Sequence, residues 1–416
     1  MRPLVVVYDQ GAASVGEIGA GLLDVAPLVF VPTGSAHARS MRPLMARFGE
    51  VATPETLAGH RPAGIVTYSE RGLRPAADLA LRLGLPFHDA ATTRALTDKW
   101  AQRRALAAGG VPVPRVRRVA RAGDWADAVA EVGLPAVLKP AHGGGSIDTH
   151  LVRDADTGGR IAAALLAGGS PGFEPGGALV LEEYLRGRDT APFGDYVSVE
   201  SAVVAGRVEH IAVTGKLPLL PPFRERGNFW PPALSDDEQA EVTALAARAV
   251  GACGVTGGLT HTEVKLTPDG PRVIEVNGRL GGDLDELTGF VTGRSLVEVA
   301  GRIALGQPVD VPRAPRGRVW FHQRHVWPRV PAELVAIDGV EELRALPGVS
   351  SYRPLARPGA TAPGGTHTAE LDGTLGVVAD HATYAALADR ISATLRFRVR
   401  LDGCERVLTG HELGEL

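Results

Sequence analysis

The chain has 416 residues, of which 44% are hydrophobic and 22% charged, as in an ordinary soluble globular protein with two or three domains. Its formal net charge of −3 gives no electrostatic reason to expect nucleic acid or an anionic membrane as a partner. Two cysteines cannot form a disulfide framework or a zinc site, and no apolar run reaches membrane length, so we expect a cytoplasmic protein.

Apolar runs that end in turn residues alternate with helical patterns over residues 1–92. The runs are PLVVVYD, PLVFVPT and AGIVTYSE, and LRPAADLALRLGL has the pattern of an amphipathic helix. This alternation is typical of a small parallel α/β unit. Glu70 ends the third run, where open α/β sheets bind ligands, so it is a candidate substrate residue, with a surface carboxylate as the alternative.

The middle of the chain mixes helices, strands and one long loop. Residues 92–110 have the pattern of a helix, and DYVSVESAVVAGRVEHIAVTGK alternates as two strands around Ala205-Gly206. A Pro- and Arg-rich loop, LPLLPPFRERGNFWPP, and a helix follow. QPVDVPRAPRGR, at 307–318, is typical of a linker and leaves a C-terminal segment of mixed strand and helix.

The stretch HTEVKLTPDGPRVIEVNGR, residues 261–279, has the pattern of a β-hairpin with a Pro-Asp-Gly turn. A turn centred on Asp269 predicts three facing pairs: Val264 with Ile274, Glu263 with Glu275, and His261 with Asn277. Directly opposed side chains lie only about 5 Å apart, and like charges there are destabilising. Two solvated glutamates are one interpretation of this pair; a bound cation between them is the other.

Two further segments could bind phosphate or a nucleotide. KPAHGGGSID places a lysine at a strand end just before three glycines, whose backbone N–H groups can approach an anion, although a plain hairpin turn is the alternative. LVLEEYLRGRD is an apolar strand that ends in acidic residues, which could meet an adenine edge and ribose hydroxyls or face water. Only four of the 44 basic residues are lysines, so each invites a specific explanation: Lys99, Lys139, Lys216 and Lys265.

Together these segments resemble the ATP-grasp superfamily, over residues 90–305, and most of all its bacterial amino-acid (dipeptide) ligases. Glu275-Val276-Asn277-Gly278-Arg279 is similar to the family's E-x-N-x-R, and Glu263 precedes Glu275 by twelve residues, as in biotin-carboxylase-like members. The resemblance implies an ATP-grasp fold in three parts: an N-terminal Rossmann-like α/β domain at 1–92, a two-lobed ATP-grasp domain at 93–306 with a flexible lid lobe near 115–190, and a small α+β domain at 307–416.

The resemblance also implies the roles of individual residues. Mg²⁺, or alternatively Mn²⁺, would be held by Glu263, Glu275 and Asn277. ATP would be bound by Lys99, Lys139, Gly143, Gly144, Gly145, Ser146, Glu182, Glu183, Leu185 and Asp189. Catalysis is assigned to Arg279, Lys139 and Arg226, and the candidate substrate residues are Glu70, Lys216, Arg224, His261, Gly281, Gly282 and Asp283.

The activity that the resemblance implies is ATP-driven formation of an amide bond, with an acyl phosphate as the intermediate and ADP and phosphate as products. The expected substrates are a small-molecule carboxylate and an amine, such as amino acids; a homodimer is one option for the assembly. Two alternatives stay open: a biotin-carboxylase-like or purine-pathway ligase, and a nucleotide-binding regulator without catalysis. The complete set of Glu263, Glu275, Asn277 and Arg279 argues against the regulator.

Overall fold

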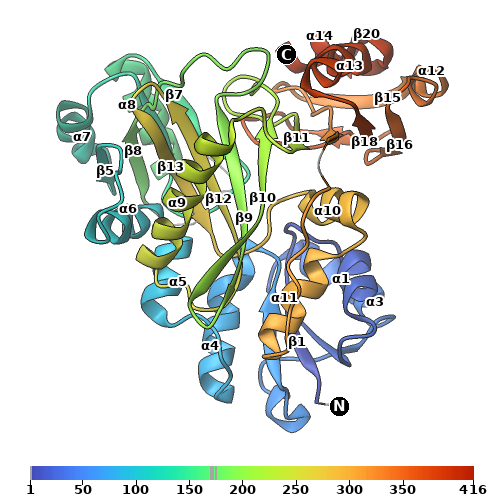
Figure 1. Ribbon diagram of the computed structural model, residues 1–416. Coiled ribbons are helices and arrows are strands. Elements are labelled where there is room, and N and C mark those ends of the chain that lie inside the picture. The colour runs from blue at the N-terminus through green and yellow to red at the C-terminus, as the bar shows by residue number, and fades with distance from the viewer. Residues whose placement is uncertain (1, 169–172, 174–175, 316) are drawn as a thin grey trace.

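The N-terminal segment forms a four-stranded parallel sheet, as predicted (Figure 1). The computed structural model describes residues 2–168, 173, 176–315 and 317–416. Strand order is β3-β2-β1-β4, and apolar side chains of the two central strands, β1 and β2, are buried on both faces. The strands are β1 (Leu4–Tyr8), β2 (Leu28–Pro32), β3 (Glu50–Val51) and β4 (Gly64–Thr67); the helices are α1 (Val15–Leu22), α2 (Ala36–Ser40), α3 (Arg42–Met45) and α4 (Leu73–Leu83).

Two helices from later in the chain complete this N-terminal unit. They are α10 (Leu284–Thr292) and α11 (Leu296–Ala304), which directly follow the predicted catalytic hairpin. Leu296 and Val297 of α11 are buried in one cluster with Leu4 and Leu22, and the Tyr68 hydroxyl donates to the Val297 carbonyl at 3.0 Å. The packing of α10 and α11 therefore holds the end of the hairpin against the N-terminal sheet.

The helix predicted at 92–110 is two helices, so that prediction is wrong in this detail. They are α5 (Ala90–Thr97) and α6 (Lys99–Ala108), separated by Asp98 in extended conformation. The Asp98 carboxylate accepts from the backbone N–H groups of Trp100 and Ala101, at 2.9 and 3.1 Å, and so caps α6. This break places Lys99 in the first turn of α6 rather than in a helix interior.

A four-stranded antiparallel sheet forms the lobe predicted as a lid. Its order is β5-β8-β6-β7, with two helices against it. The elements are β5 (Val116–Val119), α7 (Trp125–Val132), β6 (Ala136–Pro140), β7 (His150–Val152), α8 (Ala155–Leu166) and β8 (Leu179–Glu183). Residues 169–172 and 174–175 of this predicted lobe, and residue 316 of the predicted linker, lie outside the described residues.

An eight-stranded antiparallel sheet forms the centre of the molecule, in the order β13-β12-β9-β10-β11-β14-β18-β16. Helix α9 (Asp236–Ala252) contacts β13, β12, β9 and β10. The strands are β9 (Tyr196–Val204), β10 (Arg207–Lys216), β11 (Gly227–Trp230), β12 (Gly258–Thr267), β13 (Gly270–Asn277), β14 (Val319–Gln323), β16 (Val349–Pro354) and β18 (Asp372–Val378).

The Pro- and Arg-rich segment predicted as one loop contains strand β11, which is a correction to the sequence interpretation. Asn228 and Trp230 of β11 pair with His322 and Trp320 of β14. Because β14 lies beyond the predicted boundary at 306, one continuous sheet joins the ATP-grasp segment to the C-terminal segment.

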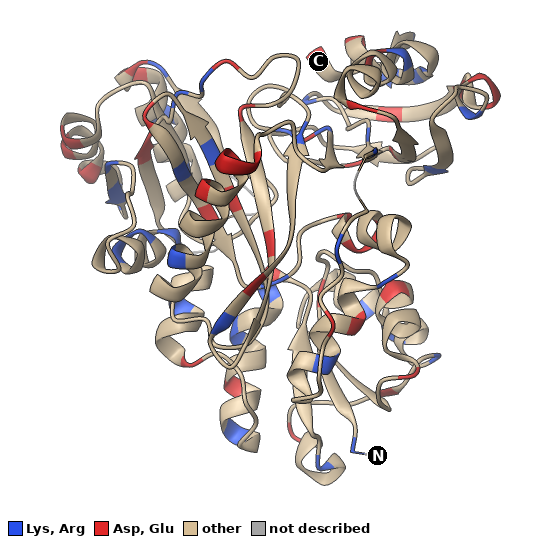
Figure 2. Ribbon diagram, viewed as in Figure 1, with Lys and Arg blue, Asp and Glu red and all other residues tan. Residues whose placement is uncertain are grey.

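The rest of the C-terminal segment forms a second small sheet, β17-β15-β19-β20, with helices beside it. Its elements are β15 (Ala332–Asp338), α12 (Val340–Arg344), β17 (Thr361–Ala362), α13 (His381–Thr394), β19 (Arg396–Leu401), β20 (Cys404–Thr409) and α14 (Gly410–Glu415). Within the described residues, no helix is long and apolar enough to cross a membrane. Figure 2 shows basic and acidic residues interspersed along the ribbon, in keeping with the small net charge.

Candidate active site

The β12–β13 hairpin brings the predicted acidic pair face to face. Glu263 pairs with Glu275 and His261 with Asn277, as the sequence predicted. Val264 pairs with Val273 rather than with the predicted Ile274, because a β-bulge follows Glu263. The bulge frees the carbonyl of Ile274, which accepts from the Arg103 guanidinium at 2.5 Å.

Each carboxylate of the pair has a cationic or titratable neighbour. Lys99 Nζ lies 3.0 Å from Glu275 Oε1, and His261 Nε2 lies 3.4 Å from Glu263 Oε1. Burial raises the pKa of Glu275, but the ammonium groups of Lys99 and Lys139 outweigh it, and the pKa is lowered overall. Glu275 is therefore ionised near neutral pH, as a cation ligand must be.

The hairpin offers few ligands of its own to a metal ion. Two carboxylates and the Asn277 amide oxygen face the site, and the described residues contain no group of three or more His, Cys, Asp or Glu that could hold a metal. Mg²⁺ prefers such a sparse set, because water and phosphate oxygens complete its octahedron. The donor set thus fits Mg²⁺ bound together with a nucleotide and does not fit a closed structural site.

A lysine and an arginine surround the end of β8. Lys139 Nζ lies 2.8 Å from Glu182 Oε2 and Arg103 Nε lies 2.9 Å from Glu182 Oε1. Burial raises the pKa of Glu182, but Arg103 and Lys139 outweigh it and lower the pKa to about 2. The Glu182 side chain is therefore engaged by cations, so any contact with an adenine edge would come from the strand's backbone.

The segment after β8 carries the other predicted adenine and ribose residues. Glu183 accepts from the Arg115 guanidinium at 3.3 Å. The Tyr184 N–H donates to the Pro135 carbonyl at 3.3 Å, which extends the strand pairing one residue past the end of β8. Leu185 is therefore the first residue beyond the sheet. Asp189 Oδ1 accepts from a backbone N–H two residues later at 3.1 Å. Leu185 and Asp189 thus both follow the strand whose end lies beside the lysine of β6.

The glycine loop joins β6 to β7 of the lid lobe and contacts α6, the segment before β11 and the C-terminal segment. The Gly143 carbonyl accepts from Lys99 Nζ, and Gly143, Gly145 and Ser146 all have positive φ. The Ser146 hydroxyl donates to the Phe223 carbonyl at 2.9 Å. Two further contacts come from the C-terminal segment: Thr366 Oγ1 donates to the Ser146 carbonyl at 3.1 Å, and the Thr368 N–H to the Gly145 carbonyl at 3.2 Å.

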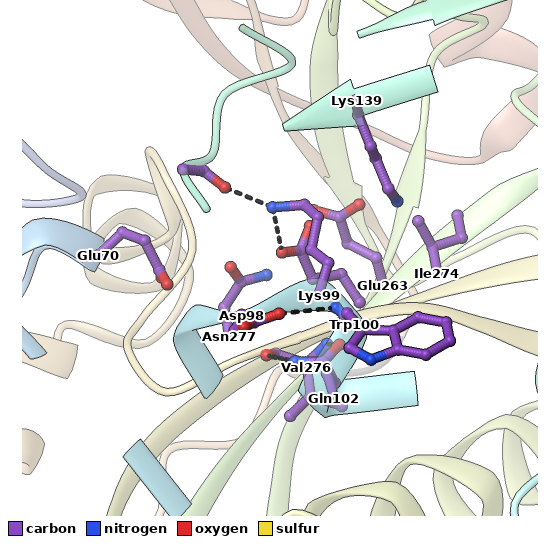
Figure 3. A network of polar contacts seen from close by, with 12 residues as sticks. Glu70, Asp98, Lys99, Trp100, Gln102, Lys139, Glu263, Ile274, Val276 and Asn277 are labelled. Carbon is purple, nitrogen blue, oxygen red and sulfur yellow. Dashed lines mark hydrogen bonds and ion pairs between the residues drawn. The ribbon is translucent and has the colours of Figure 1, made fainter. Parts of the chain in front are cut away.

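Arg279 lies between the predicted metal-binding residues and the N-terminal unit. Its Nη2 lies 3.4 Å from Asn277 Oδ1, and its Nη1 donates to the Leu280 carbonyl at 2.9 Å. A side chain at Gly144 would approach the same Nη2, since a Cβ there would lie 3.8 Å away. On its other edge, Nε lies 3.8 Å from Glu70 Oε2. Figure 3 shows Glu70 extending toward Asn277 and Lys99 reaching between two acceptors.

A strip of polar residues continues from the acidic pair across the face of the eight-stranded sheet. His261 Nδ1 lies 2.7 Å from Glu200 Oε1 on β9, and Lys216 Nζ donates to Asn228 Oδ1 at 2.5 Å. Burial lowers the pKa of His261, but Glu200 outweighs it and raises the pKa to about 9. Lys265, by contrast, pairs with Asp195 at 2.6 Å.

The far end of the strip centres on Arg324, which follows β14. Arg324 contacts three carboxylates: Glu225 at 2.7 Å, Glu370 at 2.8 Å, and Asp283. Asp283 has a left-handed φ of 58° and belongs to the predicted Gly281-Gly282-Asp283 segment. Gly281 leaves no room for a side chain, because a Cβ there would lie 2.4 Å from His261 Nδ1, whereas the Cβ position of Gly282 faces open space.

The structure does not bring Arg224 and Arg226 into this site, which corrects their predicted substrate and catalytic roles. Arg224 is fully buried and donates to the carbonyls of Pro221, Trp327 and Gly414, at 3.0, 2.7 and 2.7 Å. Arg226 Nη2 faces the Ser392 hydroxyl of α13 at 3.4 Å. Both guanidinium groups therefore bind the C-terminal segment, because strand β11 turns their part of the loop toward it.

Sequence reasoning missed the residues whose partners are distant along the chain. These are Arg103, Glu200, Glu225, Arg324 and Thr368. Strand alternation in 196–204 could have placed Glu200 on the same face as the acidic pair. Nothing local in the sequence marks Arg324 or Thr368.

Comparison with known proteins agrees with this geometry. Residues 98–311 match the family of the carbamoyl-phosphate synthase L chain ATP-binding domain. The chain is 30% identical over 298 residues to an uncharacterized protein of Sinorhizobium fredii, covering 71% of this chain and 60% of that one. It is 27% identical over 267 residues to alanine–anticapsin ligase of Bacillus subtilis, covering 60% and 55% of the two chains. It thus spans little more than half the length of these relatives.

The fold as a whole is shared with a solved structure. The L-amino acid ligase of Bacillus licheniformis superimposes with a TM-score of 0.77 at 18% identity, over 95% of this chain and 98% of that chain. The family match covers the two lysines, the glycine loop, the end of β8 and the whole β12–β13 hairpin. The chain therefore belongs to the ATP-grasp family represented by the ATP-binding domain of the carbamoyl-phosphate synthase L chain.

Proposed function

We propose that this protein is an ATP-dependent carboxylate–amine ligase that joins an amino acid, or a related carboxylic acid, to the amine of a second amino acid. The observation that carries the proposal is the register of the β12–β13 hairpin, which sets Glu263 opposite Glu275 and places Asn277 beside Arg279. Opposed carboxylates are destabilising unless positive charge adjoins them, and a metal–nucleotide complex would add a cation to the neighbours Lys99 and His261.

In this proposal the nucleotide lies between the lid lobe and the hairpin. Lys99 and Lys139 now pair with Glu275 and Glu182, and their ammonium groups would contact phosphate oxygens when ATP is bound. The backbone of Gly143, Gly144, Gly145 and Ser146 would cover the phosphates. Glu183, Leu185 and Asp189 would line the adenine and ribose.

The metal ion in this proposal is Mg²⁺, with Mn²⁺ as the alternative, held by Glu263, Glu275 and Asn277. When bound, it neutralises phosphate charge and acts as a Lewis acid on the transferred phosphoryl group. His261 holds Glu263 in place from one side while itself anchored to Glu200. The chain's own residues thus orient both carboxylates, and Lys99 lowers the pKa of Glu275.

Arg279 is the proposed catalytic residue of the chemical steps. Transfer of the γ-phosphoryl group to the substrate carboxylate gives an acyl phosphate and ADP, and the amine then displaces phosphate. Negative charge develops on the transferred group and on the carbonyl oxygen, and the fixed guanidinium of Arg279 can stabilise both. Lys139 assists in the first step. The docked glycine loop excludes water, which would otherwise hydrolyse the acyl phosphate.

The substrate class follows from the relatives and from the charged strip. One relative is an alanine–anticapsin ligase and another, 32% identical over 200 residues, is carnosine synthase 1 of Gallus gallus. Amino acids carry one carboxylate and one ammonium group, and the strip offers both signs in Lys216, His261, Glu225 and Asp283. A cytoplasmic location and a homodimer are predictions from the sequence.

The test is ADP release by the purified protein with ATP, Mg²⁺ and pools of the standard L-amino acids, followed by mass spectrometry. Turnover that needs two amino acids, with a product equal to their sum minus water, supports the ligase. Turnover that needs bicarbonate instead supports carboxylase-like chemistry. Nucleotide binding without turnover supports a regulator.

A further inference from the structure

Glu70 is a partly buried carboxylate that differs from Glu182 and Glu225, because no described residue donates a hydrogen bond to its side chain. Glu182 contacts Arg103 and Lys139, and Glu225 contacts Arg324 and the Tyr196 hydroxyl. Within the described part of the chain, the only ion-pair partner of Glu70 is Arg279, at 3.8 Å, beyond hydrogen-bond distance. Its Oε2 is buried without a partner.

The direction of the Glu70 pKa shift agrees with this unmet acceptor. Burial raises the pKa of Glu70 to about 7, and the nearby Arg279 reduces that rise only in part. The pKa values of Glu182 and Glu225 are instead lowered to about 2, because cations adjoin them and outweigh their burial. A buried carboxylate can accept several hydrogen bonds, so Glu70 has free capacity for a donor from outside the described chain.

The position of Glu70 relative to Arg279 indicates what that donor is. The Nη2 edge of Arg279 faces Asn277 and the glycine loop, where phosphate is expected, while its Nε edge faces Glu70. Glu70 also comes from a different part of the fold, the short 3-10 turn Glu70–Gly72 that follows β4. An amine that approaches an acyl phosphate from the side opposite the nucleotide would therefore come close to Glu70.

We propose that Glu70 is a catalytic residue that binds the attacking amine and accepts its proton. This inference rests on the proposed function. The amine enters as its neutral form, after its ammonium has lost one proton to water. Its nitrogen forms a bond to the acyl carbon, the bond from that carbon to the phosphate oxygen breaks, and phosphate leaves with the electron pair. The second proton passes from nitrogen to Glu70, which later returns it to solvent.

Hydroxylamine separates this role from all earlier steps, because it is a small nucleophile, largely uncharged at pH 8, that captures acyl phosphates as hydroxamates. Wild type, Glu70→Gln and a control, Glu50→Gln, receive MgATP and a mixture of the twenty standard L-amino acids, with and without hydroxylamine. Glu50 is a carboxylate of the same N-terminal unit whose nearest cationic partner is His60. Dipeptides are measured by mass spectrometry and hydroxamates by their colour with ferric ion.

We expect Glu70→Gln to form hydroxamates within about threefold of wild type while its dipeptide formation falls about 100-fold, the usual effect of losing a general base. Glu50→Gln should match wild type in both products. Undiminished dipeptide formation by Glu70→Gln would overturn the inference, and so would an equal loss of both products in a folded variant. A wild-type protein that forms neither product refutes the proposed function itself.

If Glu70→Gln does not fold, a second variant, Glu70→Asp, tests the inference. Glu70→Asp keeps the negative charge but shortens the side chain by one methylene group. We expect its ratio of dipeptide to hydroxamate to fall at least about tenfold below that of wild type, since proton transfer depends on hydrogen-bond reach. An unchanged ratio contradicts the inference.

Discussion

Two regions of the molecule use buried cations in different ways. Where the β12–β13 hairpin meets the lid lobe, Lys99 and Lys139 pair with side-chain carboxylates. In the segment before β11, Arg224 donates to three backbone carbonyls. A nucleotide phosphate can replace a carboxylate as the partner of an ammonium group, whereas a buried carbonyl that loses its donor has no substitute. Cations of the first kind are available for binding, and those of the second kind hold the fold together.

The largest effect is expected in the proposed nucleotide site. Glu275→Gln removes a charge that we propose holds the divalent cation, so we expect kcat for ADP release to fall about 1,000-fold, as when a charge-stabilising group is lost. A coupled assay for ADP measures this, with Glu341→Gln on the exposed surface of α12 as the control. Activity within tenfold of wild type would show that the acidic pair does not act as proposed.

The second test concerns the region around Arg224. Arg224→Met leaves the carbonyls of Pro221, Trp327 and Gly414 without their donor, and we expect the free energy of unfolding to fall by about 3 kcal/mol. Urea denaturation measures this loss. The folded fraction should keep kcat within about threefold. Unchanged stability with a large loss of kcat would show that Arg224 acts in the active site, which would contradict the contrast between the two regions.

Two buried glutamates give opposite dependences of stability on pH. Glu182 has a lowered pKa, about 2, so its contribution is present above its unfolded value of 4.5 and is lost as pH falls toward 2. Glu70 has a raised pKa, about 7, so ionising it costs stability as pH rises from 4.5 through 7. At pH 8, we therefore expect Glu182→Gln to be less stable than wild type and Glu70→Gln more stable, by about 2 kcal/mol each.

Urea denaturation of the two variants at pH 5 and pH 8 checks these signs. The advantage of Glu70→Gln over wild type should shrink at pH 5, where most of the wild-type Glu70 is already protonated in the folded state. Two variants that shift stability in the same direction at pH 8 would contradict the contrast drawn between these carboxylates.

The smallest effect is expected at the contact between Thr368 and the glycine loop, which joins the two regions. The Glu225 N–H donates to Thr368 Oγ1 at 3.1 Å, and the Thr368 N–H donates to the glycine loop. Thr368→Val removes one of these bonds, so we expect KM for ATP to rise about fivefold, equivalent to roughly 1 kcal/mol, with little change in the urea midpoint. Thr361→Val, at an exposed position of β17, is the matched control. An unchanged KM would show that the hydrogen bonds from the C-terminal segment to the glycine loop do not contribute to ATP binding.

Local patterns predicted the parts of the site that lie within one element. The turn residues and strand alternation of 261–279 placed Glu263 opposite Glu275, because a hairpin's register follows from its own sequence. The same reasoning missed the bulge that shifts Val264 onto Val273, since a bulge alters pairing without a clear residue signal.

Long-range pairing explains the remaining errors. β11 is a strand because it pairs with β14, some ninety residues later, although its Pro- and Arg-rich surroundings are typical of a loop. That pairing turns Arg224 away from the site. It also brings Arg324 to Asp283 and Glu225, a contact among three distant segments that no local pattern encodes.

Electron paramagnetic resonance of Mn²⁺ in the presence of ADP tests most directly whether the β12–β13 hairpin binds the metal ion. Wild-type protein should bind Mn²⁺ only weakly alone and tightly with ADP, because the hairpin supplies two carboxylates and needs phosphate oxygens to complete the ion's ligands. The double variant Glu263→Gln/Glu275→Gln should lose the ADP-dependent signal. A double variant that binds Mn²⁺ and ADP as tightly as wild type would contradict the account.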